Sequence, residues 1–147
     1  MRRLFWIGFL FLIFTSCNKT EESDWTYCND CNVEAWIGTY HGDGTYYAGN
    51  NPNVTTDVSI DFSIRELYNQ KWKIVVSSEN IFIITFIGDM VDTGYYYEQA
   101  GSSKSIHLTL YEKDGNYKIS GSAKTYDATE DSVILVKSVS FDVFKQE

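Results

Sequence analysis

The sequence predicts an all-β protein, an eight-stranded antiparallel up-and-down β-barrel that follows a cleaved signal peptide and a short tether. Three observations lead to this prediction. From residue 36 onward, apolar side chains recur at every second position, which is the period of a strand with one buried face. Turn-forming residues separate these runs at short intervals. No run in this part of the sequence has the period of a convincing helix.

The clearest strand spans residues 54–65, where the apolar Val58, Ile60 and Phe62 alternate with polar side chains. Further strands are predicted at residues 36–47, 72–77, 81–88, 94–99, 105–112, 117–124 and 132–145. Asp114 and Gly115 form the strongest turn signal, a dipeptide typical of a type I′ hairpin.

Two runs depart from simple alternation. Residues 81–88 are apolar on both faces, and their β-branched and aromatic content favours a strand over a short buried helix. We expect their outer face to be covered or to contact another chain.

In the last strand, Lys137 interrupts the apolar series. A bulge at Lys137 and Ser138 would turn the charge to solvent and place two apolar residues inward, Ile134 and Val136.

An eight-strand meander with one apolar face has few stable arrangements. Closure into a barrel hides that face and removes both unpaired edges. A two-sheet sandwich is the alternative, and the short hairpins favour the barrel. A barrel of this size is either filled by side chains or holds one small ligand. We therefore expect a small apolar or aromatic ligand near its open end, against a lining of Trp36, Tyr40, Phe62, Trp72 and Leu108.

The first residues are typical of a secretory signal peptide. Arg2 and Arg3 precede an apolar run of eleven residues, 4–14, which is shorter than the roughly 18 that cross a bilayer. The four residues that end at Cys17 (FTSC) resemble the lipobox of bacterial lipoproteins, although Phe14 stands where leucine is usual. This resemblance implies cleavage before Cys17 and a lipid on its thiol. An ordinary secretory signal with a coincidental cysteine is the alternative.

Three segments are therefore expected: a signal peptide at 1–16, a lipidated acidic tether at 17–35, and the barrel at 36–147. In lipoproteins, an aspartate directly after the lipidated cysteine resembles a signal for retention in the inner membrane, and here that position is Asn18. The resemblance therefore implies the outer membrane of the cell envelope, with the domain periplasmic or surface-exposed. Loss of Arg2 and Arg3 changes the net charge from −8 to −10. Such an acidic surface repels nucleic acid and anionic lipid headgroups, so neither nucleic acid nor electrostatic docking onto a membrane is expected, and membrane contact is expected through the lipid on Cys17.

Cys28 and Cys31 form a C-x-x-C motif in the tether. In an oxidising compartment a disulfide is the default state, so a local structural staple is the favoured interpretation. A redox-active pair is a second possibility, but no βαβ pattern accompanies the motif. A zinc site is a third, and one C-x-x-C supplies two of the four ligands that zinc requires.

The first predicted strand carries a resemblance to a known group of folds. Residues 36–40 (WIGTY) at the start of an eight-strand meander resemble the opening strand of lipocalin-like barrels, the calycin group that includes avidins. The usual G-x-W is here Gly38-x-Tyr40, with the tryptophan displaced to Trp36. Glycines at alternate inward positions, among them Gly42, let this strand coil sharply.

No motif predicts catalysis, a metal or a cofactor. His41 and Asp43 share one strand face, but two polar residues in a row are typical of a solvated surface. The acidic loop at Asp89 and Asp92 lacks the spacing of a calcium site. Nucleophile-elbow, zinc-protease and phosphate-loop motifs are missing from the sequence. The protein is expected not to be an enzyme.

Two other functions remain open. A solid barrel could serve as a non-enzymatic interaction module that docks onto another envelope protein through an outer face formed by Phe82, Ile84 and Phe86. Thiol–disulfide chemistry through Cys28 and Cys31 would require an exposed, readily reduced pair.

Overall fold

The computed structural model describes residues 24–49, 53–91, 93–128 and 132–147. The signal peptide and Cys17 lie outside these residues. In chain order the elements are β1 (Thr26–Tyr27), α1 (Val33–Trp36), β2 (Gly38–Ala48), β3 (Thr55–Glu66), β4 (Lys71–Ser78), β5 (Phe82–Asp89), β6 (Tyr96–Ala100), β7 (Lys104–Lys113), β8 (Asn116–Ala128) and β9 (Val133–Lys145). Within the described ranges, no helix has the length and apolarity to cross a membrane.

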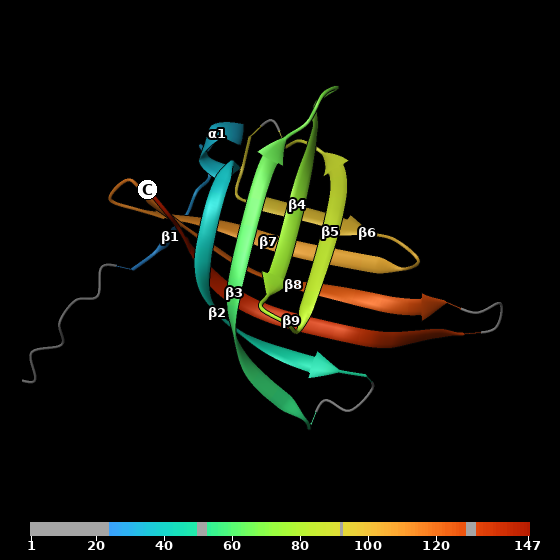
Figure 1. Cartoon of the computed structure of the whole chain (residues 1–147). Coiled ribbons are helices and arrows are strands. Elements are labelled where there is room, and N and C mark those ends of the chain that lie inside the picture. The colour runs from blue at the N-terminus through green and yellow to red at the C-terminus, as the bar shows by residue number, and fades with distance from the viewer. Residues whose placement is uncertain (1–23, 50–52, 92, 129–131) are drawn as a thin grey trace, which may run out of the picture.

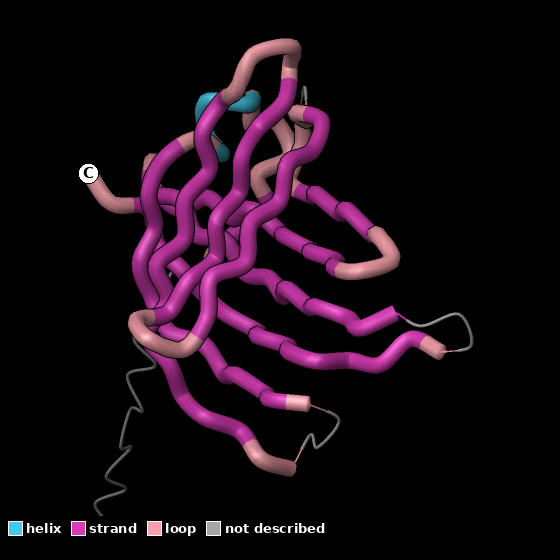
Figure 2. The backbone as a smooth tube through the Cα atoms, turned by 45° about the vertical axis from the view of Figure 1, so that its right-hand side comes forward, coloured by secondary structure: helices cyan, strands magenta, loops and turns pink. Residues whose placement is uncertain are grey.

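The nine strands form one antiparallel sheet in the order β1-β7-β8-β9-β2-β3-β4-β5, with β6 beside β7. Strands β2 to β5 pair successively, as do β6 to β9, and β9 returns to pair with β2. The all-β, eight-stranded up-and-down fold is therefore confirmed, with the two-residue β1 added. Figures 1 and 2 show how β2–β5 cross over β6–β9 as the sheet curls around its interior.

The sheet does not close by hydrogen bonds, which corrects the expectation that both edges disappear. Among the described residues no ladder joins β5 to β6. The connecting chain instead turns toward the N-terminal segment, where Gly94 N–H donates to Cys31 O at 2.9 Å and Thr93 bridges Asn32. The outer edge of β5 therefore stays without a partner strand.

Tight coiling of β2 against β9 depends on Gly42. A Cβ atom at this position would lie 2.1 Å from the carbonyl oxygen of Asp142 and 2.9 Å from the Cα atom of Val143. Both atoms belong to the backbone, so a side chain would force the two strands apart. The predicted role of inward glycines in the first strand is confirmed at this position.

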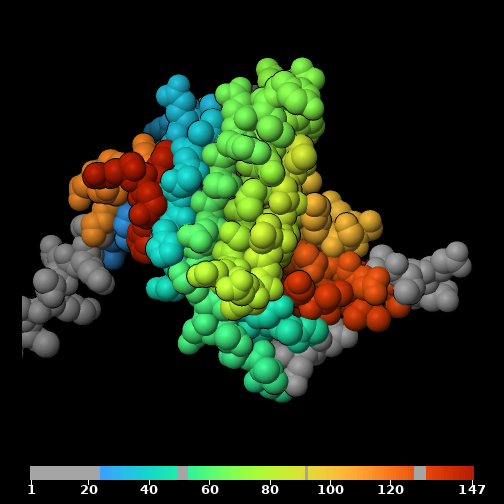
Figure 3. All heavy atoms as spheres, in the orientation of Figure 1, coloured from blue at the N-terminus to red at the C-terminus, as the bar shows by residue number. Residues whose placement is uncertain are grey.

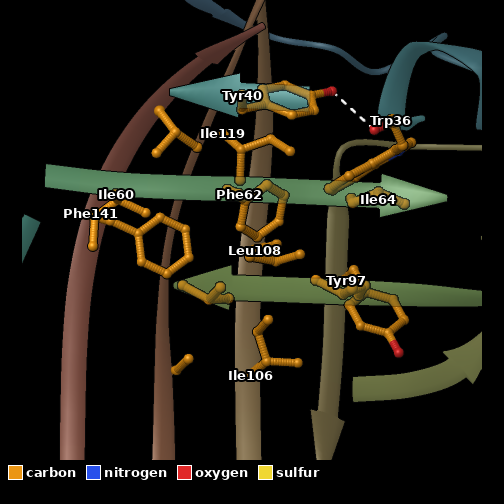
Figure 4. Packing of buried hydrophobic residues seen from close by; sticks show 14 of the residues in the cluster. Trp36, Tyr40, Ile60, Phe62, Ile64, Tyr97, Ile106, Leu108, Ile119 and Phe141 are labelled. Atoms are coloured by element: carbon orange, nitrogen blue, oxygen red, sulfur yellow. Dashed lines mark hydrogen bonds between the residues drawn. The ribbon is translucent and has the colours of Figure 1, made fainter. Parts of the chain in front are cut away.

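The apolar face of the sheet forms a single core. Its large, almost fully buried side chains come from α1 and from strands on both sides of the barrel, including Trp36, Tyr40, Ile60, Phe62, Trp72, Phe86 and Leu108. Figure 4 shows part of this core. Asp114 and Gly115 both have positive φ angles, 52° and 80°, as a type I′ hairpin requires. In the space-filling view the outer face of β2–β5 is a continuous surface (Figure 3).

Regular structure begins earlier in the sequence than the period-two pattern predicted. Trp36 belongs to α1 and not to the first strand, because the Asn32 side chain accepts hydrogen bonds from the Glu34 and Ala35 amides and starts one helical turn. The absence of helix was therefore a wrong expectation. Part of the segment expected as tether is also folded, since Thr26 and Tyr27 pair with β7.

The orientation of β5 is opposite to the one expected. Phe82, Ile84 and Phe86 are buried, whereas Ile83 and Ile87 are 76% and 57% exposed. The side chains that face the interior are those opposite Ile74 and Val76 of β4, which are themselves buried. The proposed outer face of Phe82, Ile84 and Phe86 is therefore wrong.

The bulge of the last strand lies at Val136, one residue earlier than predicted. Thr125 pairs with Lys137, and the next residue, Tyr126, pairs with Leu135, so Val136 is the additional residue. Lys137 is partly exposed. Ile134 and Val136 are 42% and 38% exposed, so their expected inward placement is wrong.

Candidate functional site

Helix α1 closes one end of the barrel and places Trp36 in the interior. The indole N–H of Trp36 donates to the carbonyl oxygen of Gly94 at 3.0 Å. The Tyr40 hydroxyl shares its proton between the carbonyl oxygens of Ala35 and Trp36, each at 2.9 Å. These carbonyls lie at the C-terminus of a one-turn helix, where intrahelical partners are lacking. Burial, and secondarily the charge of Tyr117, raise the pKa of Tyr40 far above its ordinary value.

The five expected lining residues belong to one interior cluster. Figure 4 labels four of them, Trp36, Tyr40, Phe62 and Leu108. All five are at most 2% exposed, and they come from α1, β2, β3, β4 and β7. The rings of Trp36 and Trp72 lie 5.8 Å apart, and those of Tyr40 and Phe62 lie 5.6 Å apart. Aromatic side chains therefore fill much of this end of the barrel.

Trp72 carries an unsatisfied polar atom in this apolar cluster. Its Nε1 atom is buried and has no hydrogen-bond acceptor in the described structure. The nearby Tyr97 hydroxyl donates to Gln99 Oε1 at 2.9 Å. Burial raises the pKa of Tyr97, and the nearby Trp72 N–H partly offsets this rise. The Trp72 N–H and the Tyr97 hydroxyl nevertheless do not have the geometry of a hydrogen bond. A buried donor without an acceptor requires an explanation.

The gap between β5 and β6 lies beside this donor. The Tyr97 hydroxyl packs against the backbone of Gly88, where an added Cβ would lie 2.0 Å from the oxygen. Two long side chains span the gap: Gln99 Nε2 donates to Ile87 O at 3.2 Å, and Lys104 Nζ donates to Thr85 O. Because side chains can rotate whereas a ladder cannot open without breaking several bonds, this gap is a candidate entrance.

The outer face of β2 and β3 brings a Ser–His–Asp row together. His41 Nδ1 lies 2.9 Å from Asp61 Oδ1, and Ser59 Oγ lies 3.4 Å from His41 Nε2. The His41 and Asp61 side chains are 56% and 73% exposed, so solvent surrounds the row. The backbone amides of His41 and Ser59 lie within paired strands and not at an oxyanion site. The row therefore does not make a catalytic site.

The other candidate ligands remain apart. Asp43 lies opposite Ser59, while His107 packs against the Tyr96 ring at 4.9 Å on the other half of the sheet. Across the described ranges no three histidine, cysteine or acidic side chains come together as metal ligands. A surface groove of about 860 Å³, which sequence reasoning missed, is lined by polar residues such as Asp43, Asp57 and Asp142 and by apolar ones such as Phe141 and Phe144.

A disulfide joins Cys28 and Cys31, and both residues are 8% exposed. The Cys28 amide donates to Leu110 O at 3.1 Å, which holds the loop against β7. This burial within the core favours a structural staple over a redox site, because exchange requires access to the sulfur atoms.

No protein-family model matches the sequence, and no curated protein matches it. Among solved structures, fatty-acid-binding protein 1 of Echinococcus granulosus is similar, with 12% sequence identity and a TM-score of 0.32. The match covers 78% of this chain and 99% of that protein. A similarity at this level carries no argument about function.

Proposed function

We propose that this protein is an outer-membrane-anchored lipoprotein of the cell envelope whose lipocalin-like barrel binds one small apolar or aromatic ligand, and that it is not an enzyme. The observation that carries the proposal is the buried Nε1 donor of Trp72, which lacks an acceptor among the described aromatic and aliphatic side chains. A ligand with a hydrogen-bond acceptor would complete this site.

The chemistry of the interior restricts the ligand class. An unsatisfied buried donor costs about 1–3 kcal/mol, which an acceptor on the ligand would restore. The described buried residues include no lysine, arginine or histidine that could neutralise an anion. The preferred ligand is therefore an uncharged apolar ring or chain that carries a carbonyl or ether oxygen.

Entry takes place at the β5–β6 gap. Rotation of Gln99 and Lys104 away from the carbonyl oxygens of Ile87 and Thr85 opens a path toward Tyr97 and Trp72 without breaking a strand ladder. The end of the barrel next to Trp72 is covered by α1 (Figure 1), whose Trp36 ring lies 5.8 Å from the Trp72 ring. The ligand thus enters from the side of the barrel.

A pair of matched probes tests this proposal. Acetylnaphthalene carries a carbonyl acceptor, whereas ethylnaphthalene has nearly the same shape without one. By titration calorimetry, Trp72→Phe should weaken acetylnaphthalene binding about 5- to 10-fold and change ethylnaphthalene binding less than about 2-fold. If neither probe binds the wild-type protein saturably, the interior holds no ligand and the proposal is wrong.

A second candidate function is an interaction module that docks onto another envelope protein. The outward side chains of β5 favour it, because Ile83 and Ile87 are exposed beside an edge without a partner strand. Ile83→Lys together with Ile87→Lys should then abolish co-purification with that partner while the naphthalene titrations stay unchanged. Loss of probe binding without loss of co-purification would assign the function to the interior.

A further inference from the structure

A second surface combines aromatic rings and lysines on the outer face of β7, β8 and β9, next to β1. We call it the aromatic–lysine surface, and it consists of Trp25, Tyr27, Tyr111, Lys113, Lys118 and Phe144. Sequence spacing does not predict it, since its members come from four separate segments. The sheet register brings them together by pairing Tyr111 with Lys118 and Lys118 with Phe144.

Trp25 lies at the centre of the aromatic–lysine surface. Its ring centroid is 5.7 Å from that of Phe144, and the Nζ atoms of Lys118 and Lys113 lie 5.5 Å and 5.9 Å from it. Lys118 Nζ also lies 4.7 Å from the Tyr111 ring, on which Tyr27 stacks at 5.1 Å. Tyr27 and Phe144 are nevertheless 54% and 44% exposed, and Trp25, Lys113 and Lys118 are partly exposed, so rings and lysine side chains reach the surroundings together.

The two lysines are available to an anionic partner. The salt bridges of the described residues are His41–Asp61 and Lys71–Asp89, and neither Lys113 nor Lys118 takes part. Among the described residues, this places two cations that form no salt bridge on one aromatic patch, with Asp114 lining the same pocket as Trp25 and Lys113. An anionic surface would be attracted here and repelled by most of the remaining surface.

The position of the aromatic–lysine surface in the chain indicates which anionic partner it meets. Trp25 follows Cys17 by eight residues, and eight extended residues span at most about 28 Å. A lipid on Cys17 therefore holds Trp25 within about one domain diameter of the bilayer. β1, which directly follows Trp25, lies on the same side of the molecule as the C-terminus (Figure 1).

We propose that the aromatic–lysine surface binds the headgroup region of the bilayer that anchors the protein. Tryptophan and tyrosine favour the membrane–water interface, and lysines favour anionic lipid phosphates. Trp25, Tyr27 and Phe144 insert among headgroups while Lys113 and Lys118 contact phosphates. A single flexible anchor then becomes a fixed orientation of the barrel. This inference rests on the lipid anchor of the proposed function.

Fluorescence of Trp25 tests the docking directly. Trp36 and Trp72 are fully buried, and Trp6 belongs to the signal peptide, so Trp25 is the tryptophan that can meet lipid. The mature lipidated protein, which begins at Cys17, is reconstituted into phosphatidylcholine–phosphatidylglycerol vesicles with brominated acyl chains. Tryptophan emission should be quenched, and Trp25→Phe should lose this quenching. Emission of the vesicle-bound wild type that is unquenched by brominated lipid and quenched by aqueous iodide would overturn the proposal.

Charge-matched variants separate docking from anchoring. Lys113→Glu with Lys118→Glu should lose the quenching, whereas Lys73→Glu with Lys124→Glu, the same charge change elsewhere on the barrel, should retain it. Equal quenching in both pairs would refute the role of the two lysines. The mass of the mature protein and its sedimentation with vesicles report the lipid on Cys17 independently. A chain without lipid refutes the anchor, and a lipidated chain whose Trp25 stays in water refutes docking alone.

Discussion

The Nζ atom of Lys145 donates a hydrogen bond to the carbonyl oxygen of Ala35 at 3.1 Å and so joins the last strand to α1. The same atom donates to Glu34 O at 3.2 Å. Lys145 and Tyr40 together satisfy the C-terminal carbonyls of a helix too short to satisfy its own. The last strand thus holds α1 in place over one end of the barrel.

Lys145→Met should lower the free energy of unfolding by about 1 kcal/mol. The methionine retains the apolar stem but leaves the carbonyl oxygens of Glu34 and Ala35 without this donor. Urea denaturation measures the change. Lys73→Met, on the outer face of β4, is the control and should shift stability by less than about 0.5 kcal/mol. Equal effects would show that the helix does not depend on this contact.

Tyr40→Phe should make the alkaline loss of stability shallower. Because burial raises the pKa of Tyr40 above its ordinary value of 10.0, the folded state keeps a proton that the unfolded state releases. The resulting stability is complete below about pH 10 and is lost as the pH rises, by up to about 1.4 kcal/mol per pH unit. Denaturation curves on both sides of pH 10 measure the slope.

At neutral pH, Tyr40→Phe should also cost about 1–2 kcal/mol, since the hydroxyl no longer reaches Ala35 and Trp36. An unchanged slope above pH 10 in this variant would contradict the assignment to Tyr40. Tyr97, whose pKa is also raised by burial, accounts for part of the slope that remains.

Gly42→Ala should lower the free energy of unfolding by more than about 2 kcal/mol, because the methyl group meets the backbone of β9. Gly101→Ala is the matched control. Its Cβ would lie 3.3 Å from Lys104 O and should change stability by less than about 1 kcal/mol. Thermal unfolding compares the two, and a stable Gly42→Ala protein would show that β2 and β9 can separate.

Adjacent substitutions on β5 test its orientation. Ile84→Lys places a charge in the core and should prevent stable folding, whereas Ile83→Lys should change stability by less than about 0.5 kcal/mol. Circular dichroism and soluble yield measure both. The reverse order of effects would restore the outer face of Phe82, Ile84 and Phe86 that was considered for the interaction module.

Cys17→Ser should remove the proposed membrane anchor. Two or three acyl chains hold a protein firmly because each buried CH₂ contributes about 0.8 kcal/mol. The variant should either leave the membrane fraction or remain uncleaved with its signal peptide. A Cys17→Ser protein that is processed and washed from membranes no more easily than the wild type would refute the lipid anchor.

The strand boundaries were predictable because alternation is a local property. Residues 54–65 were expected as a strand, and β3 spans Thr55–Glu66. All five expected lining residues are buried, because each lies on the apolar face of its own segment or next to that segment in the sequence. Where both faces of a segment are apolar, as in β5, local periodicity cannot select the inward face.

Much of the candidate site was not predictable from the sequence. The unsatisfied Trp72 donor depends on which atoms surround one nitrogen, and the β5–β6 gap depends on the hydrogen bond that joins Gly94 to Cys31. The aromatic–lysine surface depends on strand register, which brings Lys118 and Phe144 together from distant parts of the chain. Trp25 in a polar segment showed no period that would place it on the barrel.

The sequence by itself determined an all-β fold and a meander of eight main strands, and it predicts the lipid anchor at Cys17. These features depend on the order of residues along one segment. Only the tertiary structure decided that α1 covers one end, that β5 keeps an open edge, and that Trp25 lies on lysines of β7 and β8. Each of these features depends on contacts between segments far apart in the chain. The free energies of such contacts cannot be inferred from the pattern of residues within one segment.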